Sequence, residues 1–195
     1  MTVTIETLSG AALTAALPDL ARLRIAVFRD WPYLYDGDMA YEEGYVRAYA
    51  ESPGAVVIGA RADGRLVGAA TAAPMAEHDE AFAAPLRAAG HEPAAFFYFG
   101  ESVLLPDYRG HGIGHAFFDR REDAARAQRF RHACFCAVIR PADHPLRPAG
   151  ARALEPFWRA RGYAPLEGVT ASFNWKDVGE ETETAKPMQF WARTL

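Results

Sequence analysis

Apolar and polar positions alternate in different ways along the first quarter of the chain, and each pattern predicts an element. Residues 3–8 alternate apolar and polar side chains, as a half-buried strand does. Residues 18–30 repeat apolar side chains at intervals of three and four, which predicts an amphipathic helix. Asp38 stands where it can cap a second helix, expected over residues 39–51. The chain is therefore expected to open with a strand and two helices.

Turn residues separate the apolar runs in the middle of the chain. An Asp-Gly pair lies between two such runs, residues 55–62 and 65–73, and predicts a tight β-hairpin. The Ala-rich, polar residues 75–93 are expected to form a connection that holds a short helix. Residues 94–105 form a long aromatic and aliphatic run, which predicts a buried strand.

The second half of the chain continues this alternation. The expected elements are helices at residues 112–129 and 154–161, a proline-rich loop at residues 140–150, and strands at residues 132–139, 170–177 and 188–193. Neither a repeat nor a long linker interrupts the order. The sequence therefore predicts one α/β (α+β) domain over residues 1–195, built on a mixed sheet.

Composition narrows the class of protein. The 195 residues are 50% hydrophobic, enough for one sizeable core, and the formal net charge of −4 lacks the basic footprint of a general nucleic-acid binder. No apolar run approaches the roughly 18 residues of a membrane span, and residues 1–10 lack a signal-peptide pattern. Cys134 and Cys136 are too few for a disulfide scaffold and fit a strand core. We expect a cytoplasmic protein without nucleic-acid or membrane partners.

The segment after residues 94–105 carries the clearest candidate chemistry. Residues 109–114 have the sequence Arg-Gly-His-Gly-Ile-Gly and open the next predicted helix. Alternate glycines allow a ligand to approach the backbone, and the N–H groups of a helix N-terminus attract anions. The spacing fits neither the G-x-G-x-x-G of dinucleotide-binding folds nor the G-K-[ST] ending of a P-loop. The turn suits a pyrophosphate, and a tight turn without a ligand is the alternative.

The string R-x-x-G-x-G, formed by Arg109, Gly112 and Gly114 after V-L-L-P-D-Y, resembles the coenzyme A loop of the GNAT superfamily of N-acetyltransferases. Residues 155–163, E-P-F-W-R-A-R-G-Y, resemble the late helix of that family, and the order of predicted elements matches it as well. The resemblance implies a single-domain GNAT-like fold, with a mixed, mostly antiparallel sheet whose central strands splay apart and are flanked by helices.

The resemblance also implies a function, which is transfer of an acetyl group from acetyl-CoA to a primary amine by direct attack on the thioester. Acetyl-CoA would place its pyrophosphate on the glycine turn and its thioester beside the preceding strand, where a backbone N–H can polarise the carbonyl. The implied cofactor-binding residues are Ser102, Val103, Leu104, Arg109, Gly110, His111, Gly112, Ile113, Gly114 and His115. Two alternatives stay open: a non-catalytic CoA-binding sensor or partner module, and transfer of another acyl group.

Glu101 is the expected catalytic base, because an alkylammonium with a pKa of about 10.4 must lose a proton before it attacks. It directly precedes the segment implied to bind the acetyl group. Alternation along the strand would place it on one face with Phe97, Phe99, Val103 and Leu105. A solvent-facing or salt-bridged glutamate is the alternative interpretation.

The general acid is missing from its usual position in the family. Trp158 stands where many members carry a tyrosine, and an indole donates a hydrogen bond but cannot supply a proton. Packing against pantetheine and ordinary core packing are both open for this side chain. Because thiols titrate near about 8.5, the thiolate is able to leave without an acid.

The acceptor site is expected in residues 28–38, which combine aromatic rings and carboxylates. Such a segment suits an amine with an apolar part, whereas its arginine suits a carboxylate. The expected substrate-binding residues are Arg29, Trp31, Tyr33 and Tyr35. We expect no metal site, because the histidines lack metal-ligand spacing. The expected partner is a small-molecule or peptide amine, with a homodimer as an option.

Overall fold

A computed structural model describes residues 2–195 and contains one seven-stranded sheet. The strand order across the sheet is β1-β2-β3-β4-β5-β7-β6, and every neighbouring pair is antiparallel except β4 and β5. The strands are β1 (Val3–Leu8), β2 (Val56–Ala62), β3 (Arg65–Pro74), β4 (Phe96–Leu104), β5 (His132–Val138), β6 (Ala164–Trp175) and β7 (Thr184–Thr194). The predicted mixed, mostly antiparallel sheet is confirmed.

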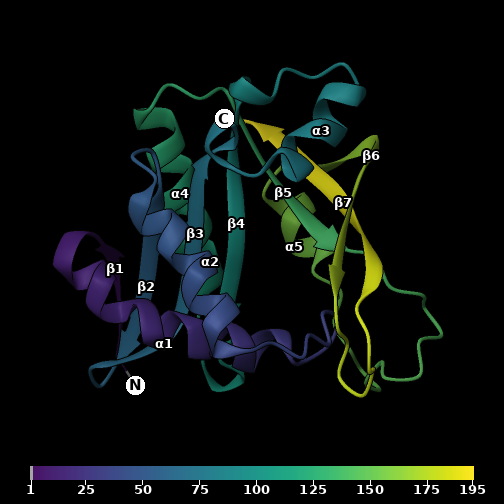
Figure 1. Ribbon diagram of the computed structural model, residues 1–195. Coiled ribbons are helices and arrows are strands. Elements are labelled where there is room, and N and C mark those ends of the chain that lie inside the picture. The colour runs from purple at the N-terminus through teal and green to yellow at the C-terminus, as the bar shows by residue number, and fades with distance from the viewer. Residues whose placement is uncertain (1) are drawn as a thin grey trace.

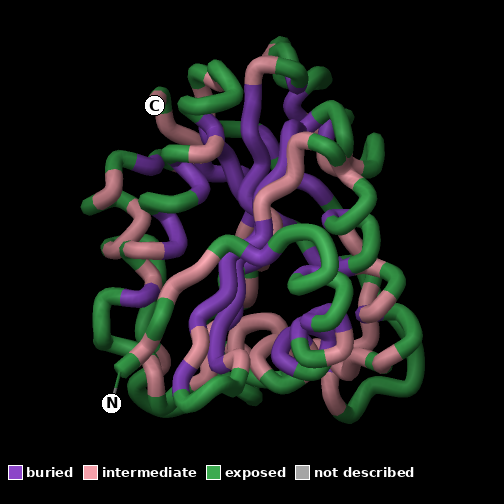
Figure 2. The backbone as a smooth tube through the Cα atoms, turned by 90° about the vertical axis from the view of Figure 1, so that its left-hand side faces the viewer, coloured by how far each residue is buried: buried purple, intermediate pink, exposed green. Residues whose placement is uncertain are grey.

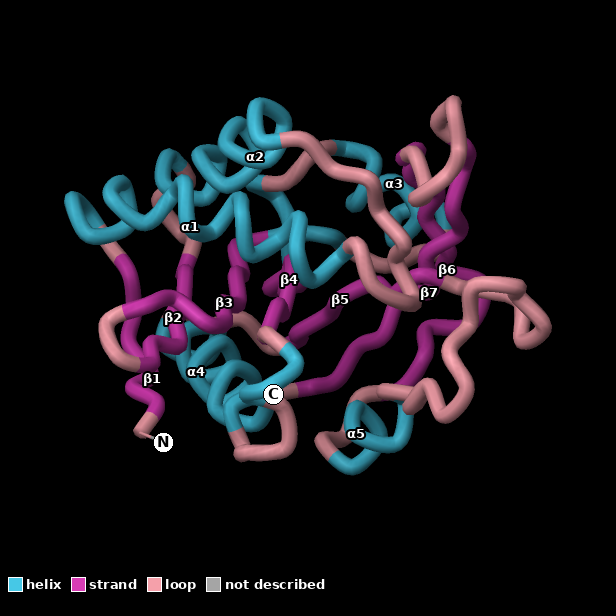
Figure 3. Tube along the Cα trace, turned by 90° about the horizontal axis from the view of Figure 1, so that it is seen from below, coloured by secondary structure: helices cyan, strands magenta, loops and turns pink. Residues whose placement is uncertain are grey.

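Helices cover both faces of the sheet. One face carries α1 (Gly10–Phe28), α2 (Met39–Glu51) and α3 (Glu80–Ala88), and the other carries α4 (Ile113–Ala127) and α5 (Glu155–Ala160) (Figures 1 and 3). Buried residues run along the central strands, while the outer turns of the helices and loops are exposed (Figure 2). Among residues 2–195, no helix is both long enough and apolar enough to cross a membrane.

The first helix differs most from its prediction. It begins at Gly10 rather than near residue 18, and Pro18 lies inside it. Leu13 and Leu17 extend its buried stripe toward the N-terminus, so packing on the sheet stabilises the early turns. The missing N–H of Pro18 costs one intrahelical hydrogen bond, which this packing outweighs. The last two strands, β6 and β7, are also longer than expected.

Small residues in β3 let both helical layers approach the sheet closely. Ala69, Ala70, Ala72 and Ala73 are each no more than 1% exposed. Ala69 and Ala73 pack under α1 and α2, whereas Ala70 and Ala72 pack in clusters on the opposite face, together with α4. The small side chains of β3 thus leave room for helices on both faces of the sheet.

The two parallel strands, β4 and β5, separate soon after they start. They pair only over Phe96–Tyr98 and His132–Cys134, although β4 continues to Leu104 and β5 to Val138. Their divergence is visible in the centre of the sheet (Figure 1). Beyond Tyr98, β4 therefore has a partner on its β3 side and an open edge on its β5 side. The predicted splaying of the central strands is confirmed.

Candidate active site

The glycine turn after β4 presents open backbone at the start of α4. Gly110 and Gly112 have φ values of +82° and +81°, a region that favours glycine. A Cβ added at either position would meet no atom within 4 Å, so the space before this backbone is free. Gly112 is the N-cap and supplies no side-chain hydrogen bond to the first turn of α4. These N–H groups therefore suit an anion such as a pyrophosphate.

Main-chain groups line the open edge of β4. The Leu105 N–H donates to the Val67 carbonyl on the β3 side, so alternation turns the N–H groups of Ser102 and Leu104 toward the open edge. Arg109 donates from Nε to the Leu104 carbonyl at 3.1 Å. Val103 differs from its neighbours, because its side chain is fully buried and its N–H faces β3.

Side chains of the glycine turn point in different directions. His111 is exposed, and Ile113 is buried under β2 and β3, so only its backbone faces the turn. The His115 ring lies 4.9 Å from the Phe157 ring of α5, and its Nδ1 is 3.2 Å from an Arg161 nitrogen. The first turn of α4 is thus tied to α5.

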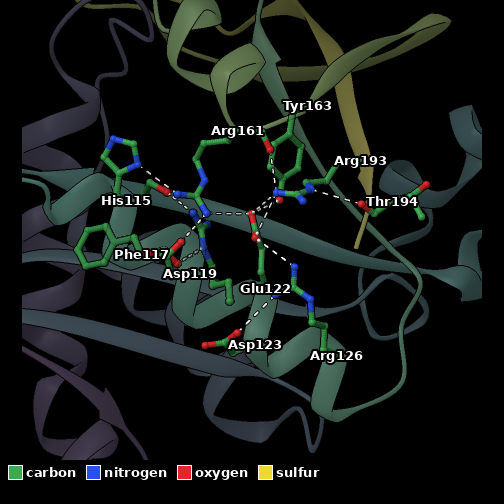
Figure 4. A network of polar contacts seen from close by, with 12 residues as sticks. His115, Phe117, Asp119, Glu122, Asp123, Arg126, Arg161, Tyr163, Arg193 and Thr194 are labelled. Atoms are coloured by element: carbon green, nitrogen blue, oxygen red, sulfur yellow. Dashed lines mark hydrogen bonds and ion pairs between the residues drawn. The ribbon is translucent and has the colours of Figure 1, made fainter.

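A buried glutamate, Glu122, links α4 to the elements beyond the divergence (Figure 4). It forms ion pairs with Arg161 of the α5 end and Arg193 of β7, at 3.2 and 3.3 Å. The Tyr163 hydroxyl donates to the same carboxylate at 3.1 Å, and burial raises the pKa of this tyrosine. The network fixes the spacing between α4 and β7, and it engages the Tyr163 hydroxyl.

Trp158 belongs to the packed core of the α5 side. Its ring lies 5.0 Å from Phe135 and 5.1 Å from Trp191, both in edge contacts. Of the two interpretations open from the sequence, this arrangement favours core packing.

A β-bulge at Glu101 overturns its expected neighbours. Thr71 alone on β3 lies opposite Gly100 and Glu101 on β4, so one extra residue shifts the register. Phe97 and Phe99 consequently pack with α4, whereas Glu101 lies on the other face with Val103, toward α1 and α2. The expectation that Glu101 shares a face with both phenylalanines is wrong, because strict alternation ends at the bulge.

The Glu101 carboxylate is buried and partly engaged. Its Oε2 lies 2.8 Å from an Arg24 nitrogen and accepts a hydrogen bond from the Tyr45 hydroxyl at 3.2 Å. Arg24 also pairs with Glu42, which is fully buried. Burial lowers the pKa of Arg24, but Glu101, Tyr45 and Glu42 raise it by more, so the guanidinium stays charged. Among residues 2–195, no hydrogen bond to the second oxygen, Oε1, is found.

Aromatic side chains surround this carboxylate. The Tyr45 and Tyr49 hydroxyls are 3.3 Å apart, and a Cβ added to Gly100 would collide with the Tyr49 hydroxyl. Glycine is therefore needed at position 100 to let α2 approach the bulge. Burial chiefly raises the pKa of Tyr49, and the charge of nearby Glu101 adds to the effect.

His78 lies beside these tyrosines, with its ring 4.8 Å from Tyr98 and 5.7 Å from Tyr49. Its Nε2 is buried without a hydrogen-bond partner among the described residues. Burial lowers the pKa of His78 from 6.5 to about 4, against smaller opposing effects of Glu101 and Glu77. The ring is therefore neutral at physiological pH.

This pKa shift predicts a pH dependence of stability. The unfolded chain binds the His78 proton near pH 6.5 and the folded protein near pH 4, so the free energy of unfolding should fall as pH drops through this window. The loss from His78 should total about 3 kcal/mol. Urea unfolding at pH 7 and pH 4.5 should show a smaller difference for His78→Phe than for the wild type. Phe82→Leu, which changes the neighbouring ring, should keep the wild-type difference, and an equal difference in all three proteins would refute the effect.

The four predicted acceptor residues divide into two groups. Arg29 pairs with Asp36 of its own segment at 2.8 Å, and the Trp31 ring lies 5.3 Å from His144 of the proline-rich loop. Tyr33 and Tyr35 lie closer to the buried charges. Burial chiefly raises the pKa of each, with additional effects of Glu101 on Tyr33 and of Glu42 on Tyr35.

Several residues around Glu101 are not identified by the sequence analysis, namely Arg24, Glu42, Tyr45, Tyr49, His78 and Arg121. The interval of four between tyrosines in α2 indicates one helix face, but nothing local indicates what that face covers. Within residues 2–195, no group of three His, Cys, Asp or Glu side chains is arranged to hold a metal ion.

Comparison with known proteins decides the family. The model of the "Acetyltransferase (GNAT) family" matches residues 20–149, which is most of the chain. The protein belongs to the GNAT acetyltransferase family. Acetyl-CoA is the acyl donor of this family, and the splayed strands and glycine turn described above fit it. A search of curated proteins gives no match.

Solved structures of GNAT proteins share the fold at low identity. The ribosomal-protein-alanine N-acetyltransferase from Brucella melitensis has a TM-score of 0.63 at 15% identity, with all of both chains covered. The putative acetyltransferase YncA from Salmonella typhimurium, solved with acetyl-CoA, has a TM-score of 0.60 at 14% identity over 100% of this chain and 95% of that chain. PaiA N-acetyltransferase from Thermoplasma acidophilum, in complex with coenzyme A, has a TM-score of 0.58 at 12% identity, with all of both chains covered.

Proposed function

We propose that this GNAT protein transfers an acetyl group from acetyl-CoA to a primary amine by direct attack on the thioester. The observation that carries the proposal is the position of Glu101. Its buried carboxylate lies at the bulge of β4, the strand with the open edge, and faces Arg24 of α1 and Tyr45 of α2. A proton acceptor thus lies one residue from the backbone implied to meet the acetyl group.

Residues on both sides of the turn would hold acetyl-CoA. The N–H groups of residues 110–115 suit its pyrophosphate, and the open edge of β4 suits its pantetheine amides. When bound, acetyl-CoA supplies a thioester whose carbonyl carbon an amine can attack. One N–H group at the open edge of β4, that of Ser102 or of Leu104, would donate to that carbonyl and stabilise its developing negative charge, and the other would remain for a pantetheine amide.

Glu101 would remove the proton of the incoming ammonium, directly or through one water. Arg24 and Tyr45 fix Oε2, which leaves Oε1 as the oxygen for this step.

The departing thiolate would leave without a protein acid. Trp158 cannot supply a proton, and the Tyr163 hydroxyl donates to Glu122. Because a thiol titrates near about 8.5, its thiolate is a competent leaving group near neutral pH.

A second candidate function is CoA binding without catalysis, as in a sensor or partner module. It is favoured by Trp158 at the acid position and by the ion pair that holds Glu101. Release of free thiol from acetyl-CoA, measured with a panel of primary amines, separates the two. Amine-dependent release supports the transferase, whereas tight CoA binding without release for any amine supports the module. Parallel reactions with longer acyl-CoA donors identify the acyl group.

Tyr33 provides a test of where the acceptor binds. Its ring packs 4.6 Å from Phe28, on the face of the sheet that carries Glu101. Tyr33→Ala should raise the apparent KM for the amine severalfold and leave CoA affinity nearly unchanged, as measured by initial rates and calorimetry. Tyr41→Ala is the matched control, since Tyr41 is 61% exposed on α2 and should change neither value. Weaker CoA binding with an unchanged amine KM would reject this location.

A further inference from the structure

Arg121 of α4 is an arginine buried without a counter-ion. Only 1% of the residue is exposed, and its four hydrogen bonds all go to neutral oxygens. Among residues 2–195, no carboxylate forms an ion pair with it. A buried charge without a counter-ion is costly in a protein core, so its hydrogen bonds must offset much of that cost.

The hydrogen bonds of Arg121 converge on the bulge of β4. One terminal nitrogen donates to the carbonyls of Thr71 and Glu101, at 3.3 and 3.2 Å. These two residues face each other at the register shift, where the regular ladder between β3 and β4 is interrupted. The other terminal nitrogen donates to Ser102 Oγ at 2.7 Å. Arg121 therefore replaces the missing ladder contacts with charge-assisted ones.

Aromatic rings fix the guanidinium in this place. Its central carbon lies 4.4 Å from the ring centre of Phe99 and 4.8 Å from that of Phe118. Nε donates to the Phe117 carbonyl one turn earlier in α4. Contacts with α4 and with both rings hold the Arg121 side chain in place, so it can act as a rigid support for β4.

We propose that Arg121 is a positioning residue for acetyl transfer, which holds the β4 bulge and thereby aims the Glu101 carboxylate and the Ser102 hydroxyl. The proposal rests on the proposed function. The bulge directs the Glu101 side chain toward α1 and α2, while its carbonyl points back to Arg121. Because Ser102 Oγ accepts from Arg121, its own hydrogen is free to donate to another acceptor on the α4 side of β4.

The charge of Arg121 persists in the conditions of the reaction. Burial lowers its pKa to about 10, with smaller opposing effects of Tyr163 and Glu101. At pH 7 the guanidinium is still protonated, so all its N–H donors remain available. Loss of these donors would leave two carbonyls unpaired and loosen the segment that carries the base.

Two substitutions and one control test the proposal. Arg121→Met keeps the bulk and removes the donors, and Arg121→Lys restores a charge. Arg120→Met alters the exposed neighbour on the same helix. We expect Arg121→Met to lower kcat about 10- to 100-fold, with the amine KM and CoA Kd within threefold of wild type. Arg121→Lys should recover part of kcat, and Arg120→Met should match the wild type.

Hydrogen exchange of the free protein gives a readout that does not depend on activity. The amides of residues 100–102 should exchange faster in Arg121→Met, while those of the β2–β3 hairpin stay as in the wild type. A folded Arg121→Met protein with wild-type kcat and wild-type exchange at the bulge would overturn the proposal. A variant with a lower Tm but unchanged kcat and unchanged exchange at residues 100–102 would overturn it as well. If Arg121→Met does not fold, the same two measurements on Arg121→Lys decide.

Failure of the role of Arg121 and failure of the proposed function give different results in these measurements. If the wild type acetylates no amine, the function fails, and exchange at residues 100–102 still shows whether Arg121 holds the bulge. If the wild type is active and the variants match it in both readouts, only the role of Arg121 fails.

Discussion

Glu101→Gln should lower kcat/KM for acetyl transfer by about 10²- to 10⁴-fold, the usual range for loss of a general base. Glutamine keeps the shape of the side chain at the bulge and can still accept from Tyr45, so CoA affinity should stay within threefold of wild type. The rate of the variant should also depend more strongly on the pKa of the acceptor amine. An amine with a lower pKa is less protonated at the assay pH and therefore needs the base less. Initial rates over a series of amines measure both effects.

Glu42→Gln is the matched control for this prediction. It removes the other carboxylate held by Arg24 but leaves β4 untouched. Both variants weaken a buried ion pair and should lose comparable stability, so thermal unfolding tests whether they are equally folded. Only Glu101→Gln should lose most of its activity. Wild-type rates in a folded Glu101→Gln protein would place the base elsewhere.

Gly112→Asp should weaken CoA binding by well over tenfold, or more than about 1.4 kcal/mol. The position has a φ of +81°, and its Cβ would project into the open space before the first turn of α4. A carboxylate there would repel the pyrophosphate and occupy its place at the helix N-terminus. Calorimetric titration with CoA measures the loss.

Gly90→Asp separates the effect on the ligand from backbone strain. Gly90 follows α3, has a φ of +80° and likewise has no atom within 4 Å of an added Cβ. Both variants add the same charge and comparable backbone strain, but only Gly112→Asp places them at the glycine turn before α4. Equal CoA affinity in the two folded variants would contradict binding at residues 110–115.

Local sequence patterns were sufficient for features that depend on neighbouring residues. Asp38 accepts a hydrogen bond from the Tyr41 N–H as a helix cap, and the Asp-Gly pair joins β2 to β3 as expected. The glycine turn adopts the positive φ values that its alternate glycines favour. In each case the deciding interactions lie within a few residues of the motif.

The surroundings of Glu101 could not be predicted in the same way. One extra residue in β4 reverses the face of the Glu101 side chain. The isolated glycine at position 100 is compatible with a bulge, but nothing in F-G-E-S indicates that Thr71 lies opposite it. Arg24 and Arg121 approach from α1 and α4, which are far apart in the chain. Their roles depend on helix placement above the alanines of β3, and such tertiary contacts have no local pattern.

The most direct test measures free CoA thiol and acetylated amine together in one reaction, for the wild type and Glu101→Gln at saturating acetyl-CoA. We expect the wild type to form the two products in equal amounts for at least one primary amine, and Glu101→Gln to lose both while still binding CoA. Saturable CoA binding by the wild type, with no amine-dependent thiol release and no acetylated product across the panel, would contradict acetyl transfer at Glu101.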